Sequence, residues 1–376
     1  MLFALRAAMI RSVRLLRAVV IGLVVGSVVA PAAAQPREVP APEGWAALER
    51  GDAARAAAVF REALERSPQN ASLHFGAGYA AFLLGRHDAA ISALRQALTL
   101  DPRSVQAAVL LAHVAYANAD LDLAIRSLEK AAALAPGDRR IAQQLEAWRK
   151  ESAVHGRLAE APGVRFRVLF EGQTQQALGD RVARVLESAY WSVGKTLNTY
   201  PSETLTVILY TDRQFQDITR APAWAGGGYD GRIRLAVGGA LKAPRALDRV
   251  VIHEFVHAVI SSVAPRNVPA WVNEGLASVL DSTDRSWSRR VIGQASELIA
   301  LEDLEEGFGD LDGPTALLAY AESAVAAEIL CERLGPNLGP FLQMLGSGHS
   351  VDQALSTLNV QPDTFHAEWR RRVGAR

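Results

Sequence analysis

The chain has 376 residues, of which 49% are hydrophobic and 21% charged; this length and composition predict two or three folded domains and exclude global disorder. Basic and acidic residues number 40 each, and four of the basic ones fall in the first 34 residues, so 36 basic and 40 acidic residues remain beyond them. That balance argues against a basic nucleic-acid-binding surface. The single cysteine, Cys331, excludes an internal disulfide and any multi-cysteine metal site.

The N-terminus has the three parts of an export signal. Residues 1–17 are basic with no acidic residue, an apolar run of 13 residues follows over 18–30, and the small residues Ala32, Ala33 and Ala34 come next. This order predicts a secretory signal peptide over 1–34 and a mature protein that is periplasmic or secreted. The apolar run is shorter than the roughly 20 residues of a membrane span. An uncleaved membrane anchor stays the alternative.

Residues 41–136 contain an internal repeat of 34 residues. Five positions keep this step, including Pro68, Pro102 and Pro136, and an alanine at 56, 90 and 124. The pattern predicts one helix hairpin per repeat, each unable to bury its apolar face alone. Residues 140–151 then read as a capping helix, so the first domain is predicted over 41–153.

This repeat resembles the tetratricopeptide repeat, with a small alanine where paired helices touch and a proline closing the second helix. The resemblance implies an all-α solenoid with a concave groove that takes an extended peptide or a protein partner. With only three copies the groove is expected to be shallow. The alternative is that these helices only brace the following domain.

The pattern changes near residue 160 and predicts an α+β domain over 160–376. Alternating or apolar runs predict strands over 164–170, 205–210 and 232–237. A Gly-rich segment over 226–228 is expected to be either a mobile lip or a simple hairpin turn. Helical spacing predicts helices over 180–197, from Asp212, over 246–262 and 270–280, and then over 338–345, 351–358 and 363–373.

An H-E-x-x-H motif lies inside the predicted helix 246–262, with His253, Glu254 and His257 as its members. Residues i and i+4 share one helical face, so both imidazoles can reach a single ion at about 2.0–2.1 Å. Glu254 is rotated by about 100° and can touch a water on that ion without being a ligand. The motif therefore predicts a zinc site with Glu254 as general base.

A catalytic zinc needs three protein ligands and one open position. Glu274 lies 17 positions beyond His257, on the predicted second helix, where its carboxylate can complete a two-histidine, one-glutamate site. The segment 261–265, at the end of the first helix, has no third histidine. We therefore expect one Zn²⁺ per chain, held by His253, His257 and Glu274.

The H-E-x-x-H motif and a second motif over 271–277, which contains Glu274, together resemble the gluzincin metallopeptidases. The resemblance is closest to the bacterial peptidase-MA-like domains that are often fused to tetratricopeptide repeats. The resemblance implies a zincin-like fold over 160–376 and peptide-bond hydrolysis. It also implies a tyrosine that stabilises the oxyanion, for which Tyr320 is the matching position and a packing tyrosine the alternative; His349 is another possible donor. Thermolysin-like relatives have an aspartate four residues after the glutamate ligand, where this chain has Ser278, so we expect Asp281 to orient a histidine instead.

These observations predict an exported zinc metallopeptidase whose repeats recruit a protein substrate or partner, with no nucleic acid involved. Relatives hold the substrate along an edge strand, and 232–237 is the expected one. Endopeptidase action is preferred because no residue is evident that would capture a terminal amine or carboxylate. The alternative function is a non-catalytic periplasmic binding module, in which the repeats bind the partner and the peptidase fold is a degenerate scaffold.

Overall fold

The computed structural model of the chain describes residues 40–161, 163–172, 175–220, 226–238, 243–282, 284, 286–308 and 311–374. The predicted signal peptide over 1–34 lies outside this part. The described chain divides into two compact units, one ending at Gly156 and the other beginning at Arg157. The predicted architecture, a helical repeat solenoid followed by an α+β domain, is confirmed.

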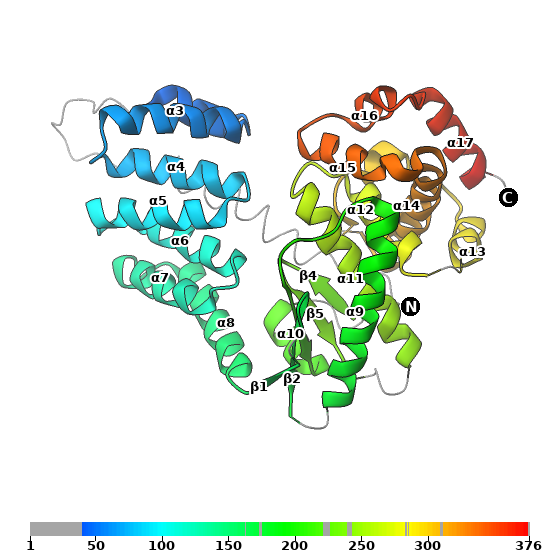
Figure 1. Ribbon diagram of the computed structural model, residues 1–376, viewed down its shortest axis with the longest axis horizontal. Helices are drawn as coiled ribbons and strands as arrows, with labels where there is room; N and C mark the ends of the chain where they lie inside the picture. The colour runs from blue at the N-terminus through cyan, green and yellow to red at the C-terminus, as the bar shows by residue number, and fades with distance from the viewer. Residues whose placement is uncertain are drawn as a thin grey trace. The chain divides into compact units, whose positions relative to one another are not determined.

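The first unit consists of helix pairs, and Figure 1 shows helices α3 to α8 lying in successive layers. Its helices are α2 (Pro42–Glu49), α3 (Ala53–Arg66), α4 (Ala71–Leu83), α5 (His87–Leu100), α6 (Val105–Ala117), α7 (Leu121–Leu134) and α8 (Arg139–His155). Most of them begin at a residue whose side chain accepts a backbone N–H of the first turn: Asp52 for α3, Asn70 for α4, Ser104 for α6, Asp120 for α7 and Asp138 for α8. These caps satisfy donors that the helix itself leaves unpaired.

Close packing in the repeat unit explains two of its helical glycines. The ring of Phe60 is fully buried and lies against both Gly44 and Gly76. A Cβ on Gly76 would come within 2.5 Å of that ring, and one on Gly44 within 2.9 Å. Glycine normally destabilises a helix, so its presence here indicates that the helices approach too closely for any side chain.

The second unit contains a five-stranded sheet and most of the remaining helices. Its strands are β1 (Leu158–Ala161), β2 (Phe166–Glu171), β3 (Leu205–Tyr210), β4 (Gly227–Tyr229) and β5 (Ile233–Ala236). Its helices are α9 (Gln176–Leu197), α10 (Asp212–Thr219), α11 (Pro244–Val263), α12 (Ala270–Leu280), α13 (Ser286–Gln294), α14 (Gly313–Leu334), α15 (Leu338–Gly346), α16 (Val351–Thr357) and α17 (Pro362–Gly374), with short 3-10 helices η2 (Leu301–Leu304) and η4 (Gly335–Asn337).

The sheet has the strand order β1-β2-β3-β5-β4. Strands β2, β3 and β5 run parallel, and β1 and β4 pair antiparallel at the two edges. Helices α9 and α11 pack against the sheet (Figure 1), with Phe166, Leu235, Leu186 and Phe255 in the shared core. The sheet thus supports the helix that carries the H-E-x-x-H motif.

Two sequence predictions about this sheet are wrong. Strand 232–237 was expected at the edge, but β5 is paired on both sides, by β3 and by β4. The Gly-rich segment is neither a lip nor a simple turn, because Gly227–Tyr229 forms β4 and pairs with β5. Three residues, two of them glycines, carry too weak a strand pattern to be recognised.

Helix α14 lies deep in the second unit. Among the described residues, the stretch Gly313–Gly346 is long and apolar enough to cross a membrane by length and composition, but 67% of its most apolar window is buried, as in a core helix. Its Glu322 has no solvent exposure and accepts the N–H of Ile299 at 3.2 Å. Burial raises the pKa of Glu322 to about 7, although the hydrogen bond from Ile299 opposes this shift.

The buried carboxyl of Glu322 should make stability depend on pH. Because its pKa is raised on folding from 4.5 to about 7, its contribution is fully present below pH 4.5 and is lost as the pH rises through 7. The free energy of unfolding of the wild type should fall by about 3 kcal/mol as the pH rises through this range. Glu322→Gln has no carboxyl group at this position and should not show this fall. Urea unfolding of both proteins between pH 4.5 and 8, monitored by hydrogen exchange of the α14 amides, measures this difference. Equal pH slopes for both proteins would contradict the prediction.

Candidate metal centre

Helices α11 and α12 carry all the predicted metal ligands. Pro244 stands in the first turn of α11, where its fixed φ and missing N–H favour a helix start. The helix runs to Val263, so His253 and His257 lie one turn apart within it. Helix α12 follows over Ala270–Leu280, packs against α11 and carries Glu274.

The three predicted ligands converge on one point. Oε2 of Glu274 lies 3.4 Å from Nε2 of His257 and 3.6 Å from Nε2 of His253, and all three ligand atoms lie within 4.8 Å of one another. Two ligands of one tetrahedral zinc ion at about 2.1 Å lie about 3.4 Å apart. The donor set and its spacing therefore fit zinc. His257 and Glu274 are each only 2% exposed.

The second ring nitrogen of each histidine contacts a side chain from the neighbouring helix or its end. Nδ1 of His257 lies 2.8 Å from Oδ1 of Asn273, and Nδ1 of His253 lies 3.1 Å from Oδ2 of Asp281. Arg249 donates to the other oxygen of Asp281, at 3.3 and 3.4 Å. Such contacts fix the tautomer that leaves Nε2 free to bind a metal. From the sequence we expected Asp281 to orient a histidine, because Ser278 occupies the position of the aspartate in thermolysin-like relatives. The contact between Asp281 and His253 agrees with that expectation.

The electrostatics of the cluster favour a cation. Burial alone would lower the pKa of His253, but hydrogen bonds to Asp281 and Glu274 and the nearby charge of Glu254 raise it to about 10. The neighbouring carboxylates thus stabilise a positive charge on the ring of His253, which borders the point where the three ligand atoms converge. Glu254, one residue after His253, is itself only 2% exposed.

Asp281 gives a direct test of this support. We expect Asp281→Ala to weaken zinc binding about 10–100-fold, because His253 loses the acceptor that orients its ring. Asp281→Asn keeps an oxygen at the same place and should lose much less. Competition with a chromogenic chelator measures both affinities. If Asp281→Ala bound zinc as tightly as the wild type, orientation by Asp281 would not matter for the metal.

The other predicted residues lie on α14 and just after α15. Tyr320 is on α14, 2% exposed, with its ring edge-on to Phe308 at 5.2 Å between centroids. His349 follows α15, and its Nδ1 lies 3.0 Å from Oγ of Ser347. The oxyanion role of either residue stays a prediction.

Asn273 and Arg249 were not assigned a role from the sequence. Asn273 directly precedes Glu274 in the sequence. A polar residue next to a predicted ligand was the one sequence signal that could have pointed to its role. Arg249 lies four positions before His253, on the same helical face. A spacing of four residues is common in helices, so it does not by itself indicate a metal site. The role of Arg249 becomes visible only through its hydrogen bonds to Asp281 in the structure.

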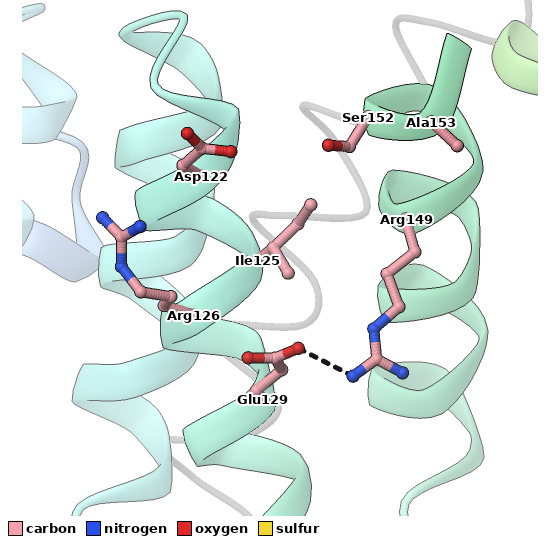
Figure 2. A pocket seen from close by; sticks show the side chains of 7 residues that line it. All are labelled: Asp122, Ile125, Arg126, Glu129, Arg149, Ser152 and Ala153. Atoms are coloured by element: carbon pink, nitrogen blue, oxygen red, sulfur yellow. Dashed lines mark hydrogen bonds and ion pairs between the residues drawn. The ribbon is translucent and has the colours of Figure 1, made fainter. Parts of the chain in front are cut away.

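The repeat unit has a hollow between α7 and α8, shown in Figure 2. Its lining is mixed in charge, with Asp122, Arg126 and the ion pair between Glu129 and Arg149, whose atoms lie 2.7 Å apart. The lining residues include no histidine or cysteine. The hollow therefore presents charged and polar groups, and its lining offers no evident catalytic chemistry.

Comparison with protein families agrees with both units. A model of the Peptidase MA superfamily matches residues 193–374, and two tetratricopeptide-repeat models match residues 42–105 and 81–148. The chain joins tetratricopeptide repeats to a Peptidase MA superfamily domain. The matched part of that domain runs from the end of α9 to α17, and it contains the whole histidine–glutamate cluster together with Asn273 and Asp281. Both resemblances predicted from the sequence are confirmed.

Solved structures give matches of lower similarity. The first tetratricopeptide domain of Spaghetti (RPAP3), bound to an HSP90 peptide, is 20% identical with a TM-score of 0.30, covering 31% of this chain and 91% of its own. The second such domain of human RPAP3, in complex with an HSP70 peptide, is 19% identical with a TM-score of 0.28, covering 30% and 92%. The UNC-45 chaperone is 14% identical with a TM-score of 0.31, covering 89% and 32%. No curated protein matches the chain.

Proposed function

We propose that the chain is an exported, zinc-dependent peptidase that cleaves within protein chains, and that its repeats recruit the substrate or a partner. The observation that carries the proposal is the spacing of His253, His257 and Glu274, whose ligand atoms suit one ion, beside the buried Glu254. The Peptidase MA superfamily match supports the reaction class. Export rests on the signal-like sequence over 1–34.

Each residue of the site has a distinct role in the proposed reaction. His253, His257 and Glu274 would hold the zinc, and Asn273 and Asp281 orient the two imidazoles. Zinc, when bound, supplies a Lewis acid that polarises a peptide carbonyl and lowers the pKa of water. Glu254 takes the proton from the attacking water and then gives it to the departing amine. Tyr320 is the proposed donor to the oxyanion.

The substrate is proposed to bind along β4, which replaces β5 as the edge strand. Among the described residues, β4 pairs only with β5, so the outer side of its backbone can pair with an extended peptide. Backbone pairing of this kind is independent of the peptide's side chains. It therefore suits a peptidase that receives its substrate from a separate recruiting unit.

Metal removal and replacement test the proposal. Protein stripped of metal by a chelator should bind one zinc per chain on titration, and zinc should restore cleavage of an unstructured peptide library. Glu274→Gln should neither hold the ion tightly nor cleave. Failure to bind zinc would refute the proposal. Zinc binding without any cleavage would favour the non-catalytic binding module, whose partner capture should survive His253→Ala.

A further inference from the structure

The edge strand β4 lies in contact with the helix that carries the proposed base. In the sheet, Gly227 is opposite Leu235, and β4 packs on α11. A Cβ added to Gly227 would stand 2.7 Å from Cγ1 of Val250, 3.1 Å from Cγ of Glu254 and 3.1 Å from Cδ2 of Leu235. Val250 and Glu254 are one helical turn apart, so both contacts come from the same face of α11.

Backbone conformation does not explain a glycine at this position. The described glycines with positive φ are Gly51, Gly85, Gly172, Gly231, Gly335 and Gly348, and Gly227 is not among them. A glycine inside a strand weakens it, and often marks a place where another group approaches closely. The requirement at Gly227 is therefore space, and what occupies that space includes the side chain of Glu254.

We propose that Gly227 is a positioning residue, which lets the edge strand lie close enough to Glu254 for a peptide paired to β4 to pass beside that base. This inference rests on the proposed peptidase function and on β4 as its binding edge. Because the side chains of Val250 and Leu235 are buried and have little room to move, we expect any side chain at position 227 to move the strand and the bound peptide away from α11. The three metal ligands lie on α11 and α12, so the strand can move without displacing them.

The expected effect of Gly227→Ala is on turnover more than on binding. A methyl group at 2.7 Å from Val250 must move the strand by about 1 Å to reach ordinary contact, and such a displacement can cost about 100-fold in rate. We therefore expect kcat to fall 10–100-fold, as an order of magnitude. KM should change by less than about threefold, since the outer backbone of β4 is still available for pairing.

A compensating substitution separates this role from general damage. Val250→Ala removes the nearest obstacle, so the double variant Gly227→Ala/Val250→Ala should recover most of the lost kcat. Val250→Ala alone serves as the matched control and should hydrolyse peptide like the wild type. Zinc content should stay at one per chain in all four proteins. Hydrogen exchange at Ala236, whose N–H donates to the carbonyl oxygen of Gly226 at 2.9 Å, reports strand position independently of activity.

The inference is upheld if exchange at Ala236 speeds up in Gly227→Ala and returns in the double variant together with kcat. It is overturned if Gly227→Ala turns over like the wild type, or if the double variant regains protection at Ala236 without regaining kcat. A loss of zinc from Gly227→Ala would also overturn it. If zinc-loaded wild-type protein cleaves nothing, the peptidase function itself has failed, and the positioning role falls with it.

Discussion

Glu254→Gln is expected to abolish peptide cleavage while zinc remains bound at one ion per chain. Glutamine keeps the size and burial of the side chain but cannot accept the proton of the attacking water. Loss of a general base typically costs about 10²–10⁴-fold in rate. The metal should stay bound, because its proposed ligands are His253, His257 and Glu274, and Glu254 is not one of them. Parallel measurement of zinc content and of cleavage of a quenched fluorescent peptide library separates the two effects.

The matched control for this variant is Glu302→Gln, which makes the same chemical change at an exposed position on η2. It should cleave like the wild type, whereas loss of cleavage in Glu254→Gln purified in the same way excludes a contaminating peptidase. Undiminished cleavage by Glu254→Gln would remove Glu254 from the mechanism. Loss of zinc from that variant would instead give Glu254 a structural role at the cluster.

Gly275→Ala is expected to disrupt both the packing of α12 and the metal site. A Cβ at this position would stand 2.3 Å from the backbone oxygen of Ser323 and 2.9 Å from Cβ of Ala327, both on α14. A backbone atom cannot move aside cheaply, so the two helices must separate. Overpacking of this kind costs about 1–3 kcal/mol, occasionally more. Because Glu274 is the preceding residue, zinc affinity should fall as well.

Gly293→Ala provides the control, since Gly293 also lies in a helix but a Cβ there would have no atom within 4 Å. Alanine favours a helix over glycine by up to about 1 kcal/mol, so this variant should be as stable as the wild type or slightly more stable. Hydrogen exchange of α12 and α14 amides measures the packing, and chelator competition measures the zinc affinity. Wild-type values for Gly275→Ala in both assays would show that α12 and α14 are not in such close contact.

The parts of the fold that could be predicted from sequence are those with a periodic pattern. The 34-residue step determines the helix pairs, and the H-E-x-x-H spacing places His253 and His257 on one face of α11 whatever the tertiary structure. Glu274 required a further inference, that the next helix lies against the first, which the family resemblance strengthened. The contact between α11 and α12 agrees with that inference.

What could not be predicted depends on pairing between distant segments. Strand β1 has only four residues and no alternating exposure pattern, so only its pairing with β2 defines it. The edge of the sheet at β4 depends on a strand of only three residues, Gly227–Tyr229, which pairs with β5. The contact of Gly227 with Glu254 likewise joins residues that no periodic pattern relates. Local periodicity carries no information about such approaches.

The ligands of the proposed metal and the residues that orient them all fall between Arg249 and Asp281. A single helix–loop–helix segment thus holds the complete coordination apparatus, and the loop between the last histidine and the glutamate is short enough that closing it costs little chain entropy. Parallel strands such as β2, β3 and β5 must instead be joined across long connections and form slowly. We therefore expect an ion to be captured early in folding, when the sheet is still incomplete, so that metal supply would influence the yield of folded protein.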